Sequence, residues 1–284
     1  MISLQKLIFI LGLGFLFVSC SNDDHTVTQE PSRKEKAQLV LKSLETGDVS
    51  IANKYINATT YIQHNLDAAD GRDSFIALLN SLKGSNLKVI TSRTFEDKEN
   101  NIVFLHTKYE NLFGQTFIAF DAFRFDSNNT IVEHWDNLQE EQPLNPSNHS
   151  MIDGATQVKD LNKTESNRAI VKGFVNDVLI GGDFSVLENY ISSTQYIQHN
   201  PWIADGIQGL QNGASILARY DILEVKKVWA EGNFVLVGSN ITYENEPAVV
   251  YDLFRLENNK IVEHWDVLEM TPPQSQWQNN NGKF

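Results

Sequence analysis

The string Ile131-Val-Glu-His-Trp-Asp136 returns unchanged as Ile261-Val-Glu-His-Trp-Asp266. Two further strings return with it and in the same order, Tyr61-Ile-Gln-His-Asn65 as Tyr196-Ile-Gln-His-Asn200 and Asp121-Ala-Phe-Arg124 as Asp252-Leu-Phe-Arg255. The spacing between the copies shortens by a few positions along the chain, as small insertions in hairpin turns would produce. A chain of 284 residues has room for two copies of ordinary domain size. The sequence therefore predicts a duplicated domain and not a solenoid of short repeats.

The first half of each copy is predicted to be helical. Apolar side chains recur at i, i+3, i+4 and i+7 over residues 37–44, which indicates an amphipathic helix, and residues 170–178 repeat the pattern. Gly47 ends the first helix, and Asp48 can cap the next one. The dipeptide Asp70-Gly71 begins a third helical stretch, whose counterpart in the second copy is interrupted by glycines.

The second half of each copy is predicted to be strand, and in the second copy residues 223–268 hold two hairpins. Pairing Glu257 with Ile261 puts Arg255 opposite Glu263, a favourable cross-strand ion pair. The same register sorts the side chains by face, with Asp252, Phe254, His264 and Asp266 on one face and Leu253 and Trp265 on the other. Helices followed by an antiparallel sheet predict an α+β domain with the helices over one sheet face.

These motifs resemble the SnoaL-like polyketide cyclases of the nuclear transport factor 2-like superfamily. The resemblance rests on Tyr-Ile-Gln-His-Asn followed by Asp-Gly, and on Asp-x-Phe-Arg followed by Ile-Val-Glu-His-Trp-Asp, and it covers residues 34–142 and 166–272. It implies two cone-shaped domains, each a curved antiparallel sheet wrapped by about three helices around an apolar pocket. Relatives include aldol cyclases, ketosteroid isomerase, dehydratases and non-catalytic binding or dimerisation modules, so both an enzyme and a binding module stay open.

Ketosteroid isomerase offers a residue-by-residue comparison. Its general-base aspartate falls where His64 and His199 stand, and its oxyanion-hole acid falls where Asp121 and Asp252 stand. The resemblance thus implies a histidine base, whose unperturbed pKa is about 6.5. The first-helix tyrosine of the isomerase has valine in its place in both copies, so that hydrogen-bond donor is absent.

The catalytic hypothesis is abstraction of a proton next to the carbonyl of a small apolar substrate, without a metal or an organic cofactor. The residues expected to carry the chemistry are His64, Asp121, His134, His199, Asp252 and His264. Those expected to contact the substrate are Tyr61, Asn65, Trp135, Tyr196, Asn200 and Trp265. The second copy is favoured as the active one, because Pro201 continues the His-Asn-Pro pattern of the family where the first copy has Leu66.

Each motif also has a purely structural explanation. The His and Asn of Tyr-Ile-Gln-His-Asn can be satisfied buried polar groups that tie a helix end to the sheet. Two histidines and one aspartate per copy match a 2-His-1-carboxylate count, but three separate segments supply them without metal-site spacing, so no metal is predicted. In the alternative to an enzyme, the two repeats pair as an intramolecular pseudo-dimer, with Trp135 and Trp265 at the interface, and bind a ligand or a protein.

The formal net charge of −13 and the lack of any Lys/Arg run argue against nucleic-acid binding. Near the N-terminus, the apolar run over residues 7–18 is too short for a bilayer, which needs about 20 residues, and has the form of a signal-peptide core. It ends in Phe17-Val-Ser-Cys20, which resembles a bacterial lipobox. We therefore expect a lipid on Cys20 that anchors the chain to a membrane of the bacterial cell envelope, with an ordinary signal peptide as the alternative.

The expected organisation follows from these segments. A polar stretch that contains Pro143 and Pro146 indicates a linker between the copies. The chain then divides into a signal peptide (1–19), a tether (20–33), a first domain (34–142), a linker (143–165), a second domain (166–272) and a polar tail (273–284).

Overall fold

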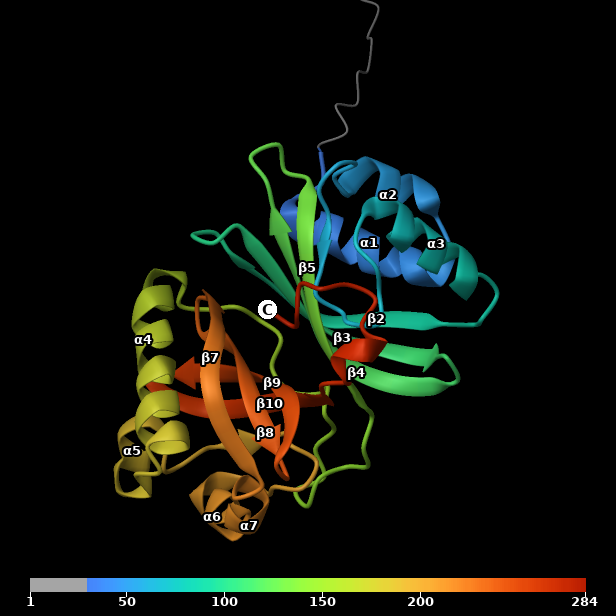
Figure 1. Cartoon of the computed structure of the whole chain (residues 1–284). Coiled ribbons are helices and arrows are strands. Elements are labelled where there is room, and N and C mark those ends of the chain that lie inside the picture. The colour runs from blue at the N-terminus through green and yellow to red at the C-terminus, as the bar shows by residue number, and fades with distance from the viewer. Residues whose placement is uncertain (1–29) are drawn as a thin grey trace, which may run out of the picture. The chain divides into compact units, whose positions relative to one another are not determined.

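The computed structural model describes residues 30–284 (Figure 1). The predicted signal peptide, Cys20 and most of the predicted tether lie outside the described residues. Pro31–Phe284 forms one compact unit, which holds both repeats. Within the described part of the chain, no helix is long and apolar enough to span a membrane.

The first repeat places its helices before most of its sheet. Its elements are α1 (Arg33–Thr46), α2 (Val49–Tyr55), β1 (Ile62–Gln63), α3 (Arg72–Leu82), β2 (Lys88–Asp97), β3 (Ile102–Leu112), β4 (Gln115–Phe125) and β5 (Ile131–Glu140). The strand order is β1-β5-β4-β3-β2, antiparallel except for the short parallel pair β1 and β5. Ser32 and Glu35 form a capping box at the start of α1. As expected, Gly47 ends α1 with a left-handed backbone and Asp48 caps α2.

The second repeat has the same strand order with more broken helices. Its elements are η1 (Leu161–Lys163), α4 (Thr164–Phe174), the π-helical turn η2 (Val175–Ile180), η3 (Phe184–Val186), α5 (Leu187–Tyr190), β6 (Ile197–Gln198), α6 (Gly206–Asn212), α7 (Ala214–Leu217), β7 (Tyr220–Glu231), β8 (Phe234–Tyr243), β9 (Glu246–Glu257) and β10 (Lys260–Met270), followed by η4 (Gln274–Gln276). The sheet runs β6-β10-β9-β8-β7. Gly213 separates α6 from α7, which confirms the expected interruption.

In each repeat the helices pack on one face of the sheet (Figure 1). In the first repeat, Leu41 of α1 and Leu79 of α3 belong to one buried cluster with Phe123 of β4. In the second, Val171 of α4 shares a cluster with Phe254 of β9. Burying a side chain of this size stabilises the fold by about 1.5–3 kcal/mol. The α+β class predicted from the sequence is confirmed.

The opposite faces of the two sheets contribute to a single apolar cluster. Trp135 of β5 lies in it together with Phe234 of β8 and Trp265 of β10, all of them buried. The Asn137 side-chain amide donates to the carbonyl oxygens of Val249 and Val267, at 3.1 and 2.7 Å. Each sheet therefore has a helix-covered face and a face turned toward the other repeat.

The β9–β10 hairpin has a β-bulge that was not predicted from the sequence. Glu257 pairs with Lys260, one residue earlier than expected, and a register shift at Val262 then brings Arg255 opposite Glu263. The Arg255 Nε and a Glu263 carboxylate oxygen lie 2.5 Å apart. The predicted ion pair and the predicted sorting of side chains by face are confirmed, because the bulge compensates for the wrong starting pair.

The segments that follow β5 and β10 each fold over the other repeat. Asn145, after β5, donates from its amide to the carbonyl oxygen of Gln198 at 2.6 Å. Asn281, after β10, donates in the same way to the carbonyl oxygen of Gln63 at 2.9 Å. Each Tyr-Ile-Gln-His-Asn string is thus covered by residues from beyond its own repeat.

Candidate functional site

The two histidines expected to act as bases lie on the wrong side of the sheet for that role. His199 stacks on Trp265 with ring centroids 4.7 Å apart, and its Nε2 lies 3.0 Å from Glu263 Oε1. His64 stacks on Trp135 in the same way, at 5.0 Å. Both rings therefore face the cluster between the sheets, away from the helix-covered face. The expectation that His64 and His199 line a pocket is corrected by this placement, and so is the assignment of the two tryptophans to the substrate.

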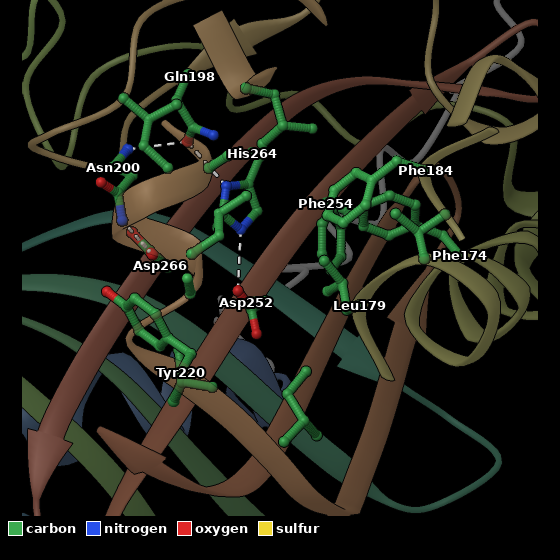
Figure 2. Close-up of a pocket in the computed structure, with 18 of the residues that line it drawn as sticks. Phe174, Leu179, Phe184, Gln198, Asn200, Tyr220, Asp252, Phe254, His264 and Asp266 are labelled. Atoms are coloured by element: carbon green, nitrogen blue, oxygen red, sulfur yellow. Dashed lines mark hydrogen bonds and ion pairs between the residues drawn. The ribbon is translucent and has the colours of Figure 1, made fainter. Parts of the chain in front are cut away.

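The second repeat contains a cavity of about 250 Å³ between its helices and the helix-covered face of its sheet. Most of its wall is apolar, and Figure 2 shows Phe174, Leu179, Phe184 and Phe254 gathered on one side. The polar residues of the wall are Tyr196, Gln198, Asn200, Tyr220, Asp252, His264 and Asp266. The volume is below the roughly 300–1,000 Å³ usual for drug-sized ligands, so the cavity suits a small molecule with one polar end.

A hydrogen-bonded chain from Gln198 through His264 to Asp252 forms the centre of the polar end (Figure 2). Gln198 Oε1 accepts from the backbone N–H groups of His199 and Asn200, at 3.0 and 2.9 Å, which identifies this atom as the oxygen. It lies 2.8 Å from His264 Nδ1, so Nδ1 must carry a hydrogen. His264 Nε2 lies 3.0 Å from Asp252 Oδ1. The single proton between these two atoms is shared by an Asp–His dyad.

The position of this proton follows from the charges around His264. Burial lowers the pKa of His264, but the hydrogen bond to Asp252 and the charges of Asp266 and Asp252 outweigh it and raise the pKa overall. The raised pKa of His264 favours an imidazolium paired with the Asp252 carboxylate. Within residues 30–284, His264 is the only side chain that hydrogen-bonds the Asp252 carboxyl group. The second Asp252 oxygen is available to a molecule in the cavity.

Among residues 30–284, two further polar groups in the cavity wall have no hydrogen-bond partner. Asp266 Oδ2 accepts from the Asn200 amide at 2.6 Å, whereas Asp266 Oδ1 is buried with no hydrogen bond. The Tyr220 hydroxyl is also buried without a partner, and burial raises its pKa so that it stays protonated. Leaving such a group unsatisfied costs about 1–3 kcal/mol. A ligand oxygen that accepts from the Tyr220 hydroxyl would recover that energy for the tyrosine.

The first repeat keeps the same polar residues in the same arrangement. His134 Nδ1 lies 3.0 Å from Gln63 Oε1, and the Asn65 amide donates to Asp136 Oδ2 at 2.8 Å. His134 Nε2 and Asp121 Oδ1, the counterparts of the second-repeat dyad, are 3.4 Å apart. Burial raises the pKa of Asp121. The catalytic candidates Asp121 and His134 thus come together, as Asp252 and His264 do in the second repeat.

A tyrosine occupies the first repeat where the second has its cavity. Asp121 pairs with Leu105 across the sheet and Asp252 pairs with Val237, so Tyr109 and Ile241, four residues further on, are equivalent. The buried Tyr109 hydroxyl is 2.9 Å from both Asp121 oxygens. Ile241 lines the cavity and leaves the second Asp252 oxygen free. At this position the first repeat has a hydroxyl group hydrogen-bonded to Asp121 and the second has open space beside Asp252.

The cavity is lined by two of the three substrate-contact candidates of its own repeat and by some residues that the sequence did not single out. Tyr196 and Asn200 line it, whereas Trp265 does not. Gln198 and Tyr220 were missed. Side-chain alternation along an extended Tyr-Ile-Gln-His-Asn would have pointed Gln198 to the same side as Tyr196 and Asn200, with His199 opposite. In the first repeat, Tyr61 and Asn65 hold the positions equivalent to Tyr196 and Asn200.

In the described part of the chain, three groups of side chains have donor atoms close enough to hold a metal ion, within 4.8 Å of one another. They are Asp121, His134 and Asp136; Asp252, His264 and Asp266; and His149, Asp153 and His199. In the first two groups the histidine ring is already engaged by a glutamine and an aspartate. The third group lies outside the cavity.

The buried Asp266 predicts a pH-dependent stability. Burial, partly offset by His264 and reinforced by Asp252, raises the pKa of Asp266 to about 6, against about 4 in an unfolded chain. Because the unfolded chain releases this proton first, the contribution of Asp266 to stability is greatest below about pH 4 and is lost as the pH rises to about 6. Asp266→Asn removes this loss, so its free energy of unfolding relative to the wild type should increase by about 2 kcal/mol from pH 4 to pH 7.

Denaturant unfolding of both proteins at the two pH values measures this difference. The asparagine can still accept the hydrogen bond from Asn200, so the variant is expected to fold. A difference in unfolding free energy that stays constant between pH 4 and pH 7 would contradict the raised pKa.

No family model and no curated protein sequence matches the chain. Each solved structure that resembles the chain aligns with a part of it about as long as one repeat. An NTF2-like protein of unknown function from Cytophaga hutchinsonii is 16% identical over 39% of this chain and 94% of that chain, with a TM-score of 0.32. IdmH, a putative polyketide cyclase from Streptomyces antibioticus, is 9% identical over 38% and 93%, with a TM-score of 0.32. A putative ketosteroid isomerase from Kribbella flavida is 16% identical over 39% and 84%, with a TM-score of 0.34. Similarity at this level assigns no activity, so the chemistry must come from the cavity itself.

Proposed function

We propose that the second repeat binds a small, largely apolar carbonyl compound and transfers a proton at the carbon next to its carbonyl group. The observation that carries this proposal is the free oxygen of Asp252, supported by His264, at the polar end of an apolar cavity. A positioned carboxylate in a site with few water molecules is a competent general base. The apolar wall supplies binding and the polar end sets the orientation.

The proton transfer uses residues that are all present in the cavity wall. The Asp252 carboxylate takes the proton, and the electrons of the carbon–hydrogen bond move into the carbonyl to form an enolate. The Tyr220 hydroxyl, which lacks a partner, donates a hydrogen bond to the enolate oxygen. Asp252 then returns the proton to the same carbon or to another carbon of the conjugated enolate. Alternatively the enolate carbon attacks a second carbonyl, and Asp252 gives its proton to the alkoxide that forms. Isomerisation or aldol ring closure would result.

Ligand binding is the first test of the proposal. Native mass spectrometry of the full chain, mixed with a panel of small cyclic ketones and enones, should show one bound equivalent per chain. Alkanes of the same size should bind more weakly, because they leave the Tyr220 hydroxyl without an acceptor. If turnover persists after a chelator is added, proton transfer does not depend on a metal ion held by Asp252, His264 and Asp266. Failure of every carbonyl compound to bind would overturn the proposal.

Binding without turnover is the second candidate function. It is favoured by the first repeat, which keeps Gln63, His134 and Asp121 in the same hydrogen-bonded order although Tyr109 occupies the space for a ligand. In that repeat, the hydrogen-bonded residues Gln63, His134 and Asp121 contribute to the fold and contact no ligand. A module that captures a ligand in the second repeat needs the cavity but not the base.

We also propose that Cys20 carries a lipid that holds the chain at a membrane of the bacterial cell envelope. Each buried CH₂ of an acyl chain contributes about 0.8 kcal/mol to membrane binding. Cys20→Ser is expected to abolish incorporation of a labelled fatty acid and to move the protein from the membrane fraction to the soluble fraction. Equal labelling and equal fractionation of the variant and the wild type would contradict lipidation at Cys20.

A further inference from the structure

The segment after β5 brings two oxygen atoms to one nitrogen of His199. The carbonyl oxygen of Ser150 lies 2.8 Å from His199 Nδ1, and Asp153 Oδ1 lies 2.7 Å from the same atom. A ring nitrogen carries at most one hydrogen, so Nδ1 cannot give each of these two acceptor oxygens a separate hydrogen. The His199 ring is fully buried, where such a mismatch is costly. A cation in place of the hydrogen would satisfy both oxygens.

The other nitrogen of His199 is fixed by a carboxylate. Glu263 Oε1 lies 3.0 Å from Nε2, and Arg255 holds the second Glu263 oxygen at 2.5 Å. A carboxylate at Nε2 keeps a hydrogen there, which leaves the Nδ1 lone pair of a neutral ring directed at Ser150 and Asp153. Carboxylate–histidine–metal triads have this arrangement, in which the second carboxylate orients the ring.

His149 supplies a second imidazole with the same kind of support. Its ring centroid lies 5.3 Å from that of His199, and its Nε2 is 3.1 Å from Asp205 Oδ2. A carboxylate on Nε2 again leaves Nδ1 as the ligand atom. The donor atoms of His149, Asp153 and His199 lie within 4.8 Å of one another.

We propose that His149, Asp153 and His199 form a zinc site that fastens the segment 149–155 to the second repeat. Two imidazoles and one carboxylate suit Zn²⁺, whereas Ca²⁺ and Mg²⁺ prefer oxygen ligands throughout. The Asp153 side chain is 48% exposed, so the site is open to solvent and a water molecule can complete a tetrahedron. The site lies on the face of the sheet opposite the cavity and is independent of the proposed proton transfer.

The backbone holds this segment close to His199. Gly154 has a φ of +94°, and a Cβ at this position would lie 2.2 Å from Glu263 Oε1 and 2.9 Å from His199 Nε2. Only glycine permits both the conformation and the approach. Arg93 binds the neighbouring carbonyl oxygens of Asp153 and Ala155, at 2.7 and 3.0 Å. The ligands are thus brought together by the fold before any metal arrives.

In the first repeat, the histidine equivalent to His199 is His64, and its hydrogen bonds need no metal. His64 Nδ1 faces one oxygen, that of Gly282, at 2.8 Å, so a single hydrogen satisfies it. Lys283 follows, and its ammonium group binds Glu269 at 2.9 Å and the Asp136 carbonyl oxygen at 2.9 Å. A lysine therefore provides a positive charge next to the first repeat, whereas the segment 149–155 contains no lysine or arginine.

Calorimetric titration of the metal-free full chain with Zn²⁺ tests the site. We expect one zinc ion per chain and an increase in melting temperature on binding. Loss of a supporting second carboxylate costs a metal site about 10–100-fold in affinity, so removal of a direct ligand in Asp153→Asn or His149→Gln should cost at least as much. Both side chains are partly exposed, so neither change should prevent folding.

Two control variants locate the metal. Asp252→Asn should keep the zinc affinity of the wild type, and so should Cys20→Ser, which removes the one thiol of the chain. The proposal is overturned if Asp153→Asn binds zinc as tightly as the wild type, or if zinc binding is lost in either control. Displacement of zinc by millimolar Mg²⁺ or Ca²⁺ would also overturn it, because the ligand set would then behave as an oxygen site.

Discussion

Replacing Asp252 by asparagine is expected to lower the rate of proton transfer by about 10²–10⁴-fold, the usual contribution of a positioned general base. Asparagine has the shape of aspartate and can still hydrogen-bond His264, so the cavity and its affinity for the ligand should change little. Loss of rate without loss of affinity identifies a group that acts in the transition state. The two quantities are measured by turnover and by titration with the same carbonyl compound.

Asp121→Asn is the matched control for this variant. Asp121 has the equivalent histidine partner, but the Tyr109 hydroxyl bonds both of its oxygens. We expect the control to be less stable, since it disturbs a buried hydrogen-bonded group, and to keep the full rate. Equal losses of rate in the two variants would mean that the change acts through the fold. An unchanged rate in Asp252→Asn would remove Asp252 from the chemistry.

Ile241→Tyr is expected to fill the cavity and to weaken ligand binding strongly. The variant places in the second repeat the residue that fills the same space in the first, where Tyr109 is buried and bonded to Asp121. A ligand would have to displace a packed ring whose burial is worth about 1.5–3 kcal/mol, which lowers affinity by about 10–100-fold or more. Titration with a ketone that binds the wild type measures the loss.

Two further variants make this result specific. Ile241→Val keeps the cavity open and should bind within a few-fold of the wild type, whereas Tyr109→Ile changes the other repeat and should leave binding in the second repeat intact. Insertion of a larger side chain costs about 1–3 kcal/mol of stability, so thermal unfolding must show that Ile241→Tyr is folded. A folded Ile241→Tyr that binds as tightly as the wild type would place the ligand elsewhere.

The fold could be predicted because its signals are long and repeated. Helical periodicity over 37–44 and hairpin signals over 223–268 span many residues, and the duplication supplies each of them twice. Even the wrong starting pair, Glu257 with Ile261, did not disturb the sorting of Asp252 and His264 onto the cavity face, since the bulge at Val262 restores the register.

The site was harder to predict, because its decisive features are local or lie across the sheet. Alternation along Tyr-Ile-Gln-His-Asn places His199 opposite Gln198, although strand β6 itself has only two residues. Comparison with an isomerase assigned the base by its place in the motif alone, and so chose His199, which does not line the cavity. The equivalence of Tyr109 and Ile241 depends on strand pairing between β3 and β4 and between β8 and β9, which the sequence does not state.

Hydrogen–deuterium exchange at the carbon next to a bound carbonyl tests the proposed function most directly. The full chain is incubated in D₂O with a small ketone that binds the second repeat, and deuterium in the ketone is followed by mass spectrometry. We predict exchange in proportion to the protein concentration, slower by about 10²–10⁴-fold in Asp252→Asn and reduced to the buffer rate in Ile241→Tyr. Exchange at the buffer rate for a ketone that occupies the cavity of the wild type would contradict proton transfer and leave a binding module.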